Sequence, residues 1–313
     1  MLYNKNDKGT AELIERLGFF AAGFKFERIA PYLEDAAREL SELFSEQVYR
    51  AVEEHYHSDS FDPFAADTGL SGKDSVTRCF QKASGAMAYL LVAPNTDLTH
   101  DDSGRNINVP ENQHLAYDSK LERSDDALRK TVSTSIDTIY SLLEKYSADF
   151  PQWHQSRQYN AAQGTLLPTA GDFSAVFDIG GSYYLFRKLA PSIRIGETSF
   201  IRPLLGDKVF QQVLADRDNT DTISLLARRA LAVRIMADSL VSASMDYYPR
   251  NIVPAKASLP DRTAERENLL ELYRTLTDSI RKILLERETP TGSAVYVRRG
   301  DINNPDAKYV YTE

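Results

Sequence analysis

The feature that most constrains the fold is an internal repeat, because two related segments of one chain are expected to fold into two related units. The residues FERIAPYLE at 26–34 align without a gap with FRKLAPSIR at 186–194, which is a shift of 160 positions. After one inserted residue the alignment resumes, with LFSEQVYRAV at 43–52 over LLGDKVFQQV at 204–213. The matched residues are mostly apolar and recur at helical spacing. They predict that one pair of packed helices occurs twice in the chain.

Both copies continue through a long amphipathic helix into similar loops, RNINVP at 105–110 and RNIVP at 250–254. We interpret these loops as corners between helices and not as a binding site used twice. The arginine stands just past the carboxyl end of a helix, where a cation meets unpaired carbonyls. The asparagine suits a turn, and the proline prevents the helix from continuing. The corner residues are Arg105, Asn106 and Pro110 in the first copy and Arg250, Asn251 and Pro254 in the second.

The helices on either side of the corners carry apolar stripes at the 3.6-residue period. After the corners, a single shift of 144 positions keeps the copies aligned, with Ser135-Ile136 over Ser279-Ile280. The stripes are Val76, Phe80, Ala83, Met87 and Leu90; Leu128, Val132, Ile136, Ile139 and Leu143; Ile223, Leu226, Ala230, Val233, Ala237 and Leu240; and Leu269, Tyr273, Leu276, Ile280 and Ile283. The repeat predicts a mainly α fold that is a tandem duplication of a four-helix unit.

The duplication divides the chain into four predicted parts. Residues 1–150 form the first helical unit, with a long insertion at 57–74 that the second copy lacks, and residues 186–290 form the second unit. The segment 151–185 contains proline, glycine and aromatic residues with partial alternation, which is typical of β-structure. Residues 291–313 resemble two short strands around an Asn-Pro turn. We therefore expect short β-containing appendages after each unit.

Charge and hydropathy exclude several classes of protein. The formal net charge is −8, and the basic residues are dispersed among acidic ones, whereas tight nucleic-acid binding relies on clustered lysine and arginine. The chain has no run of about 18 apolar residues, and its first residues lack the order of a secretory signal, so we expect neither a membrane span nor export. The single cysteine, Cys79, excludes an intramolecular disulfide and a cysteine-based zinc site within one chain.

Several polar groups resemble catalytic or metal sites, but each has a simpler interpretation. His55 and His57 project from different sides of a helix, and a solvated helix end explains them better than a metal site. The run DLTHDDSG at 97–104 lacks the ligand spacing of a calcium loop and suits a polar helix end. Gly180-Gly181 belongs to no phosphate-binding motif and predicts a turn. Cys79 lies on an apolar helix face, and we predict no catalytic residue, metal site or cofactor.

Aromatic residues near the loops are candidates for a protein interface, where such side chains are frequent anchors. They lie in the insertion of the first copy, before the second corner and in the C-terminal segment. The alternative is that they fold back onto their own helices, and the sequence does not decide between the two. The candidates are Phe61, Phe64, Tyr247, Tyr248, Tyr309 and Tyr311.

The residues FIRPLLGDKVFQQVL at 200–214 and FERIAPYLEDA at 26–36, with the long helices that follow each, resemble an uncharacterised family of proteins of roughly 300 residues. That family is encoded in Bacteroidetes phages and prophages beside virion structural genes. The helical unit is also similar in architecture to head-to-tail connector, or adaptor, proteins that form a ring under the portal of tailed phages. The resemblance implies a virion structural protein, made in the host cytoplasm, that assembles between portal and tail.

The same resemblance implies partners and a stoichiometry, but no catalytic residue. Phage connectors commonly form rings of about twelve units, so either twelve chains each present both units or six tandem chains supply twelve. Portal and tail proteins are the implied partners, and an acidic surface suits a channel that DNA passes without tight binding. One alternative is a soluble helical scaffold or regulatory protein-binding module that uses the groove between its units. A metal-dependent hydrolase centred on 53–59 or 97–102 is a weaker one.

Overall fold

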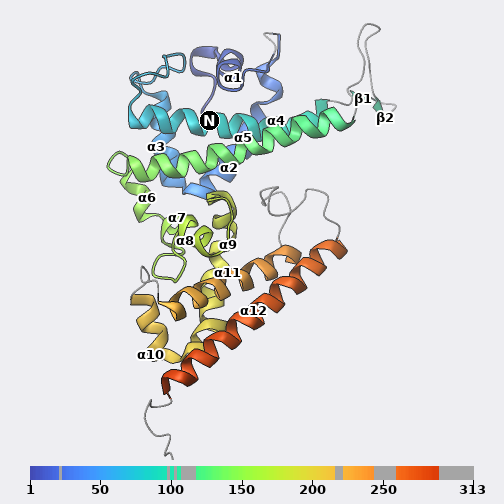
Figure 1. The fold of residues 1–313 in the computed structure, drawn as a ribbon. Coiled ribbons are helices and arrows are strands. Elements are labelled where there is room, and N and C mark those ends of the chain that lie inside the picture. Colours follow the sequence, from blue (N-terminus) through green and yellow to red (C-terminus); the bar gives the residue numbers. More distant parts are fainter. Residues whose placement is uncertain are drawn as a thin grey trace, which may run out of the picture.

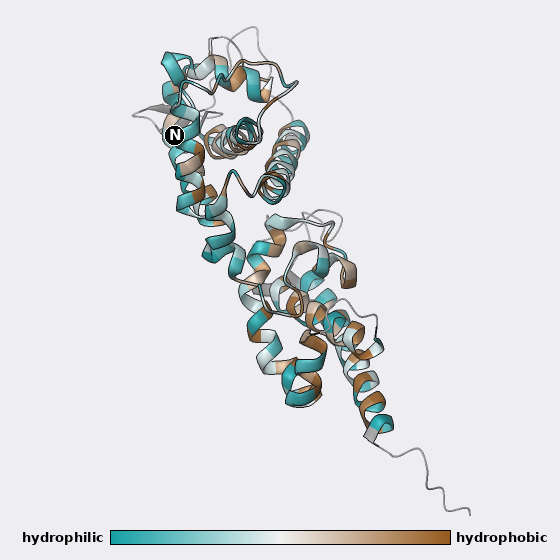
Figure 2. Ribbon diagram, turned by 90° about the vertical axis from the view of Figure 1, so that its left-hand side faces the viewer, coloured by the Kyte–Doolittle hydropathy of each residue, from teal (hydrophilic) through white to brown (hydrophobic). Residues whose placement is uncertain are grey.

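Helices account for nearly all of the regular structure in the computed structural model, which confirms the predicted mainly α class. The structure describes residues 1–20, 23–96, 99–101, 104–106, 118–215, 221–242 and 259–288. The N-terminal and C-terminal helices form two bodies stacked along one long direction, as Figures 1 and 2 show from two sides. No helix among the described residues is long and apolar enough to cross a membrane.

The N-terminal half is built around one long helix, α4. Its elements are η1 (Lys5–Asp7), α1 (Gly9–Leu17), η2 (Phe26–Arg28), α2 (Ala30–Phe44), α3 (Glu46–His57), α4 (Gly72–Thr96) and α5 (Asp118–Lys145). Helices α1, α2, α3 and α5 all pack against α4. The first turn of α4 is stabilised by a reciprocal cap, in which Asp74 N donates to Ser71 Oγ and Ser71 N donates to Asp74 Oδ2.

A short hairpin follows α4 where a helix corner was predicted. Strand β1 (Thr99–Asp101) pairs antiparallel with β2 (Gly104–Asn106), and His100 lies opposite Arg105. The prediction that Arg105 stands just past the end of a helix is therefore wrong, since the backbone after α4 satisfies its hydrogen bonds by pairing with itself. Asn106 also lies in β2. The other predicted corner residues, Pro110, Arg250, Asn251 and Pro254, fall outside the described residues.

The segment 151–185 is helical, so the prediction of a β-containing appendage is wrong there. It forms α6 (Pro151–Gln155), α7 (Arg157–Asn160) and α8 (Ala170–Val176), and its described residues contain no strand. Hydroxyl caps explain the outcome, because Ser156 Oγ accepts from the backbone of Tyr159 and Thr169 Oγ1 accepts from the backbone of Asp172. Of the aromatic residues that suggested alternation, Trp153, Phe173, Tyr183 and Tyr184 are buried, and Tyr159 and Phe177 are partly buried against the core. The predicted C-terminal appendage, 291–313, lies outside the described residues.

The C-terminal half is built around α11. Its elements are α9 (Tyr183–Gly196), the π-helix η3 (Glu197–Ile201), α10 (Arg202–Ala215), α11 (Thr222–Ser242) and α12 (Leu259–Glu288). Helix α11 packs against α12 more extensively than any other pair of elements, and it also contacts α8, α9 and η3. Gly196, the last residue of α9, permits the close approach of α9 to α11, because a Cβ atom at this position would lie 2.8 Å from Leu231 Cδ1 of α11.

The predicted apolar stripes largely form the core, which confirms the helical period inferred from the sequence. All five stripe residues of α5 are buried. Ile136 of α5 and Ile280 of α12, which the shift of 144 aligns, are both fully buried. Tyr273 and Ile283 of α12 are only partly buried and pack against the core from its edge. The amphipathic pattern therefore determines the buried faces of the long helices.

Two bends in the helices have the same unusual backbone conformation. Ser45, between α2 and α3, has φ 89° and ψ 149°, and Gly206, inside α10, has φ 72° and ψ 156°. These dihedral angles lie in a region that L side chains rarely adopt, so Ser45 is strained whereas Gly206 is not. The alignment of 43–52 with 204–213 places Ser45 over Gly206. We call residues 44–46 the elbow.

Substitutions at Ser45 and Gly206 are expected to change the free energy of unfolding in opposite directions. Ser45→Gly should raise the free energy of unfolding by about 1 kcal/mol, because relief of strain exceeds the loss of the weak cap to Val48 N. Gly206→Ser should lower it by about 1–3 kcal/mol. Chemical denaturation measures both changes. Ser41→Gly, inside α2, is the matched control, and it should be destabilising because glycine weakens a helix interior. A destabilising Ser45→Gly would contradict the strain.

Candidate functional site

The two halves meet where the N-terminus of α9 docks onto α5. Asp137 Oδ1 of α5 accepts hydrogen bonds from the backbone nitrogens of Tyr183 (2.7 Å) and Tyr184 (3.3 Å). These are orphan donors of the first helical turn, so α5 caps α9. The rings of Tyr140 and Tyr183 stack with centroids 4.1 Å apart, and Tyr184 Oη donates to Glu39 of α2 at 3.0 Å. One helix end therefore ties the C-terminal half to two N-terminal helices.

An aromatic cluster fills the centre of this junction. Trp153 of α6 is fully buried, and its ring lies 5.8 Å from Phe44 and 6.1 Å from both Tyr140 and Tyr183, measured between centroids. Its indole Nε1 donates to Glu144 Oε1 at 2.6 Å. The four rings come from α2, α5, α6 and α9, so the cluster holds these four helices together at the junction.

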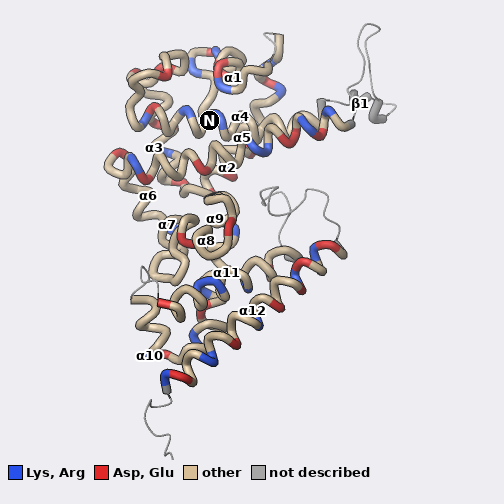
Figure 3. Tube along the Cα trace, in the orientation of Figure 1, with Lys and Arg blue, Asp and Glu red and all other residues tan. Residues whose placement is uncertain are grey.

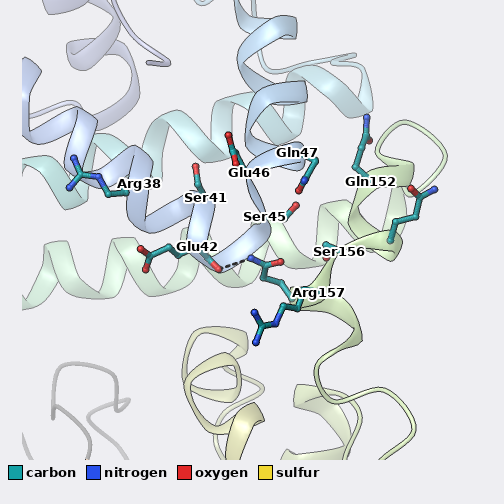
Figure 4. Close-up of a pocket in the computed structure, with 11 residues that line it drawn as sticks. Arg38, Ser41, Glu42, Ser45, Glu46, Gln47, Gln152, Ser156 and Arg157 are labelled. Atoms are coloured by element: carbon teal, nitrogen blue, oxygen red, sulfur yellow. Dashed lines mark hydrogen bonds between the residues drawn. The ribbon is translucent and has the colours of Figure 1, made fainter.

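A polar pocket of about 760 Å³ opens beside the aromatic cluster. One wall is the elbow with the ends of α2 and α3, and the other is α6 and α7, as Figure 4 shows. The Gln158 side-chain amide donates across it to the backbone oxygen of Glu42 at 3.1 Å. The lining residues of this elbow pocket are Arg38, Ser41, Glu42, Ser45, Glu46, Gln47, Gln152, Gln155, Ser156, Arg157 and Gln158. They suit hydrogen bonding and ion pairing more than nucleophilic chemistry.

Sequence reasoning did not find the elbow pocket. Its residues are dispersed over two segments more than a hundred positions apart, and none belongs to a recognisable motif. The polar run QSRQ at 155–158 was included in the predicted β-containing linker. Only the packing of α6 and α7 against the elbow brings these side chains together.

The histidines considered for a metal site have different roles. His55 Nε2 lies 2.8 Å from Asp74 Oδ1, and its side chain is 12% exposed, so the predicted solvated helix end is wrong for this residue. The contact joins the end of α3 to the start of α4. His57 packs its ring against Tyr56. Across the described ranges, no group of three or more histidine, cysteine or acidic side chains is placed to hold a metal ion. Asp97 and Asp102 fall outside those ranges.

Gly180-Gly181 and Cys79 have the structural roles that the sequence predicted. Gly180 and Gly181 have φ 65° and 67°, which confirms the turn that requires glycine dihedral angles. Cys79 of α4 is half-buried, and burial raises the pKa of its thiol. The uncharged thiol is therefore its dominant form near neutral pH, as expected for a packing residue.

The interface candidates separate into one buried and one exposed residue. Phe61 is 2% exposed and packs against Tyr56, so it folds back onto its own helix and offers no surface to a partner. Phe64 is 40% exposed, with the Lys8 ammonium 5.8 Å from its ring centroid. Tyr247, Tyr248, Tyr309 and Tyr311 lie outside the described residues.

Two buried arginines hold the segment between α3 and α4, which includes the predicted insertion 57–74. Arg78 of α4 donates to the backbone oxygen of Ala65 at 2.6 Å and pairs with Asp67 at 2.5 Å. Arg16 of α1 donates to the backbone oxygen of Pro63. Both guanidinium groups are nearly excluded from solvent. Hydrogen bonds to backbone carbonyls compensate part of the free-energy cost of removing these charges from water. The sequence signal was Arg78 itself, a charge between the apolar stripe residues of α4.

A buried carboxyl connects the first residues of the chain to α3 and α4. Glu12 is 0% exposed and accepts hydrogen bonds from Lys5 N (2.8 Å), Tyr56 Oη (2.9 Å) and Gln81 Nε2 (3.1 Å). Burial raises the pKa of the Glu12 carboxyl to about 7, and these three donors oppose the increase. The group is thus poised to change charge near neutral pH.

Comparison with known proteins finds a match to one family model over part of the chain. Residues 32–163 match a Family of unknown function (DUF6712), a segment that begins in α2 and ends just after α7. The match therefore includes both walls of the elbow pocket. No curated protein and no solved structure matches the chain.

Proposed function

We propose that the protein is a virion structural component of a tailed phage, a head-to-tail connector that assembles as a ring between portal and tail. In this proposal the chain is a tandem duplication, and further copies, portal protein and tail protein are its partners. The resemblance of 26–36 and 200–214 to phage-encoded proteins motivates the class. The observation that carries the proposal is the presentation of two similarly built helical hairpins by one chain.

The order of the helices supports the duplication. Helices α2, α3, α4 and α5 are matched in order by α9, α10, α11 and α12, and the most extensive packing in each half is between its last two helices. The shared dihedral angles of Ser45 and Gly206 add an independent match, because so unusual a conformation at two aligned positions is not expected by chance.

The one-residue insertion in the alignment also has a structural counterpart. The shift changes from 160 to 161 between 194 and 204, and the π-helix Glu197–Ile201 lies in that interval. A π-helix accommodates one extra residue in a continuous helix without disturbing either flank. The shift of 160 also carries α1 over α8, aligning the fully buried Leu13 with the fully buried Phe173. These matches favour a repeat that begins at α1.

The arrangement of the hairpins supports a role in assembly. In Figure 1 the C-terminal end of α4 and the N-terminal end of α5 lie on the same side of the molecule as the C-terminal end of α11 and the N-terminal end of α12. Figure 3 shows acidic and basic residues interspersed along α5 and α12. Such a surface does not grip nucleic acid, and it is compatible with a channel that DNA traverses.

The mass of the purified assembly tests the proposal. Native mass spectrometry of the full chain, alone and with the portal protein encoded in the same genome, should show a closed ring of twelve or six chains. Negative-stain images should show the matching symmetry. Ring formation with portal, but not with an unrelated ring protein of similar charge, is the required specificity. A chain that stays monomeric with portal would contradict the proposal.

The elbow pocket favours a second candidate, a soluble helical scaffold or regulatory module that binds a partner protein at the junction. This function predicts a stable monomer that binds its partner with one-to-one stoichiometry. Gln155 lines the pocket. Gln155→Ala should therefore weaken the binding of that partner and leave the assembly of any ring unchanged. The two functions are thus separated by oligomeric state and by sensitivity to the pocket.

A further inference from the structure

Two nearly buried guanidinium groups converge on one exposed carboxylate in the segment between α3 and α4. Asp67 Oδ1 lies 2.5 Å from Arg78 Nη1 of α4 and 4.0 Å from Arg16 Nη1 of α1. The side chains of Arg78 and Arg16 are only 6% and 9% exposed, whereas that of Asp67 is 85% exposed. The acidic group of this cluster therefore stands at the surface, where solvent and other molecules reach it.

The cluster holds more positive than negative charge. Both arginines pair with Asp67, and neither forms an ion pair with another carboxylate of the described residues. Glu15 is exposed, and its charge acts on Arg16 without such a contact. The buried Glu12 carboxyl accepts its hydrogen bonds from other donors. Burial lowers the pKa of the Arg16 guanidinium, and the positive charge of Arg78 lowers it further. One carboxylate thus serves two desolvated cations.

The residues that follow Pro63 cover the arginines with few other contacts, and we call residues 64–69 the strap. Phe61 and Pro63, just before the strap, are buried, whereas every strap residue except the half-buried Ala65 is exposed. The strap meets the guanidinium groups through the backbone oxygen of Ala65 and the carboxylate of Asp67. An exposed segment with little buried apolar surface opens locally at a low free-energy cost.

The arginines also have donors that the strap leaves unused. The Nε atoms of Arg16 and Arg78 are buried and have no hydrogen-bond partner among the described residues. Buried donors are nearly always satisfied in proteins, so two such atoms in one cluster need an explanation. The same oxygen of Asp67 makes both contacts, although guanidinium groups bind a carboxylate best when each of its oxygens accepts separately. The two arginines are therefore able to hold a carboxylate more fully than Asp67 allows.

We propose that Arg16 and Arg78 form a carboxylate-binding site covered by the strap, and that an acidic side chain of a partner protein replaces Asp67 when the strap opens. Asp67 indicates the class of ligand, because the group that occupies the site within the chain is itself a carboxylate. The entering carboxylate gains by presenting one oxygen to each guanidinium. The site goes beyond the connector function, since it lies within the N-terminal half and does not depend on ring formation.

Chemical rescue by acetate, which carries the carboxylate of an acidic side chain, tests the site. Asp67→Asn in the full chain should lower the melting temperature, because two nearly buried cations lose their counter-ion. Acetate should restore it in a saturable manner, whereas chloride at equal ionic strength should not. The wild type should need an acetate concentration about tenfold higher or more, since Asp67 competes from within the chain. Better rescue by inorganic phosphate than by acetate would contradict a carboxylate ligand.

Control variants make the assignment specific. Asp59→Asn is the matched control, because Asp59 is an exposed aspartate of the same segment and forms no ion pair with either arginine in the described structure. It should keep the wild-type melting temperature and its response to acetate. Adding Arg78→Gln to Asp67→Asn should weaken the rescue by about tenfold or more. If that protein does not fold, Arg16→Lys on the same background keeps the charge, loses the planar donors and should also weaken the rescue.

Limited proteolysis of the wild type tests the opening of the strap. Chymotrypsin cleaves after Phe64, and cleavage requires the strap to leave the arginines. Saturating acetate should therefore increase the rate of cleavage after Phe64 by about twofold or more, and Asp67→Asn should show the higher rate without acetate. Mass spectrometry of the fragments measures cleavage at this position separately from cleavage elsewhere.

Two results would overturn the proposal. If neither acetate nor phosphate stabilises Asp67→Asn in a saturable manner, the arginines accept no external anion. If acetate rescues the variant but leaves cleavage of the wild type after Phe64 unchanged, Asp67 is a permanent counter-ion and the strap does not open for a ligand.

Discussion

Replacing Trp153 with alanine is expected to lower the free energy of unfolding by about 3–5 kcal/mol. The side chain is fully buried, and its removal leaves a cavity among rings from α2, α5 and α9 that rigid neighbouring helices fill only in part. It also removes the indole donor to Glu144. Because Trp153 lies at the junction, the variant should unfold in two steps, as the halves lose the contact that couples them.

Chemical denaturation followed by circular dichroism measures the effect, and calorimetry detects a second transition. His154→Ala is the matched control, since the next residue is exposed and its ring contacts only the surface groups Glu144, at 3.4 Å, and Tyr159, at 4.6 Å between centroids. Its effect on the free energy of unfolding should stay within about 1 kcal/mol. The loss of stability in Trp153→Phe should lie between those of the two alanine variants, because phenylalanine keeps an aromatic ring but loses the hydrogen bond to Glu144. A loss below about 1 kcal/mol for Trp153→Ala would show that the junction collapses around the cavity.

Replacing Glu12 with glutamine is expected to change how stability depends on pH. The folded-state pKa of Glu12, about 7, lies above the ordinary value of 4.5 for a glutamate carboxyl. The folded protein therefore binds a proton that the unfolded chain has released, and the stability linked to Glu12 is fully present below pH 4.5 and is lost as pH rises through 7. The groups around the carboxyl are Lys5, Tyr56 and Gln81, with Tyr3 and Arg16 behind them.

The measured quantity is the free energy of unfolding of Glu12→Gln minus that of the wild type. This difference should grow by up to about 3 kcal/mol between pH 4.5 and 7 and then remain constant. Taking the difference removes the slopes that Asp137 and Glu197 contribute, since burial raises the pKa of both carboxyls. Glu15→Gln, exposed on the same helix, should show no such growth. A difference that grows toward acid would mean that the three donors outweigh burial.

The sequence predicted the elements whose structure is decided locally. The apolar stripes of α4, α5, α11 and α12 repeat at the helical period, and that period alone determines which face is buried. The alignment placed Ser45 over Gly206, but the bend at each position came only from the structure, because the backbone dihedral angles are not part of an apolar pattern. The helices of segment 151–185 are too short for apolar residues to repeat at the helical period, so the sequence did not predict them.

What the sequence determined by itself is the helical class, the buried faces and the aligned order of the helices, since each depends on residues within a few turns of one another. Only the tertiary structure decided the elbow pocket, the burial of Glu12 and the docking of Asp137 onto the first turn of α9. Those features depend on desolvation and on charges brought together from distant segments, and neither quantity is a property of a local pattern. The hydroxyl cap at Ser156 begins α7, which forms part of the wall opposite the elbow.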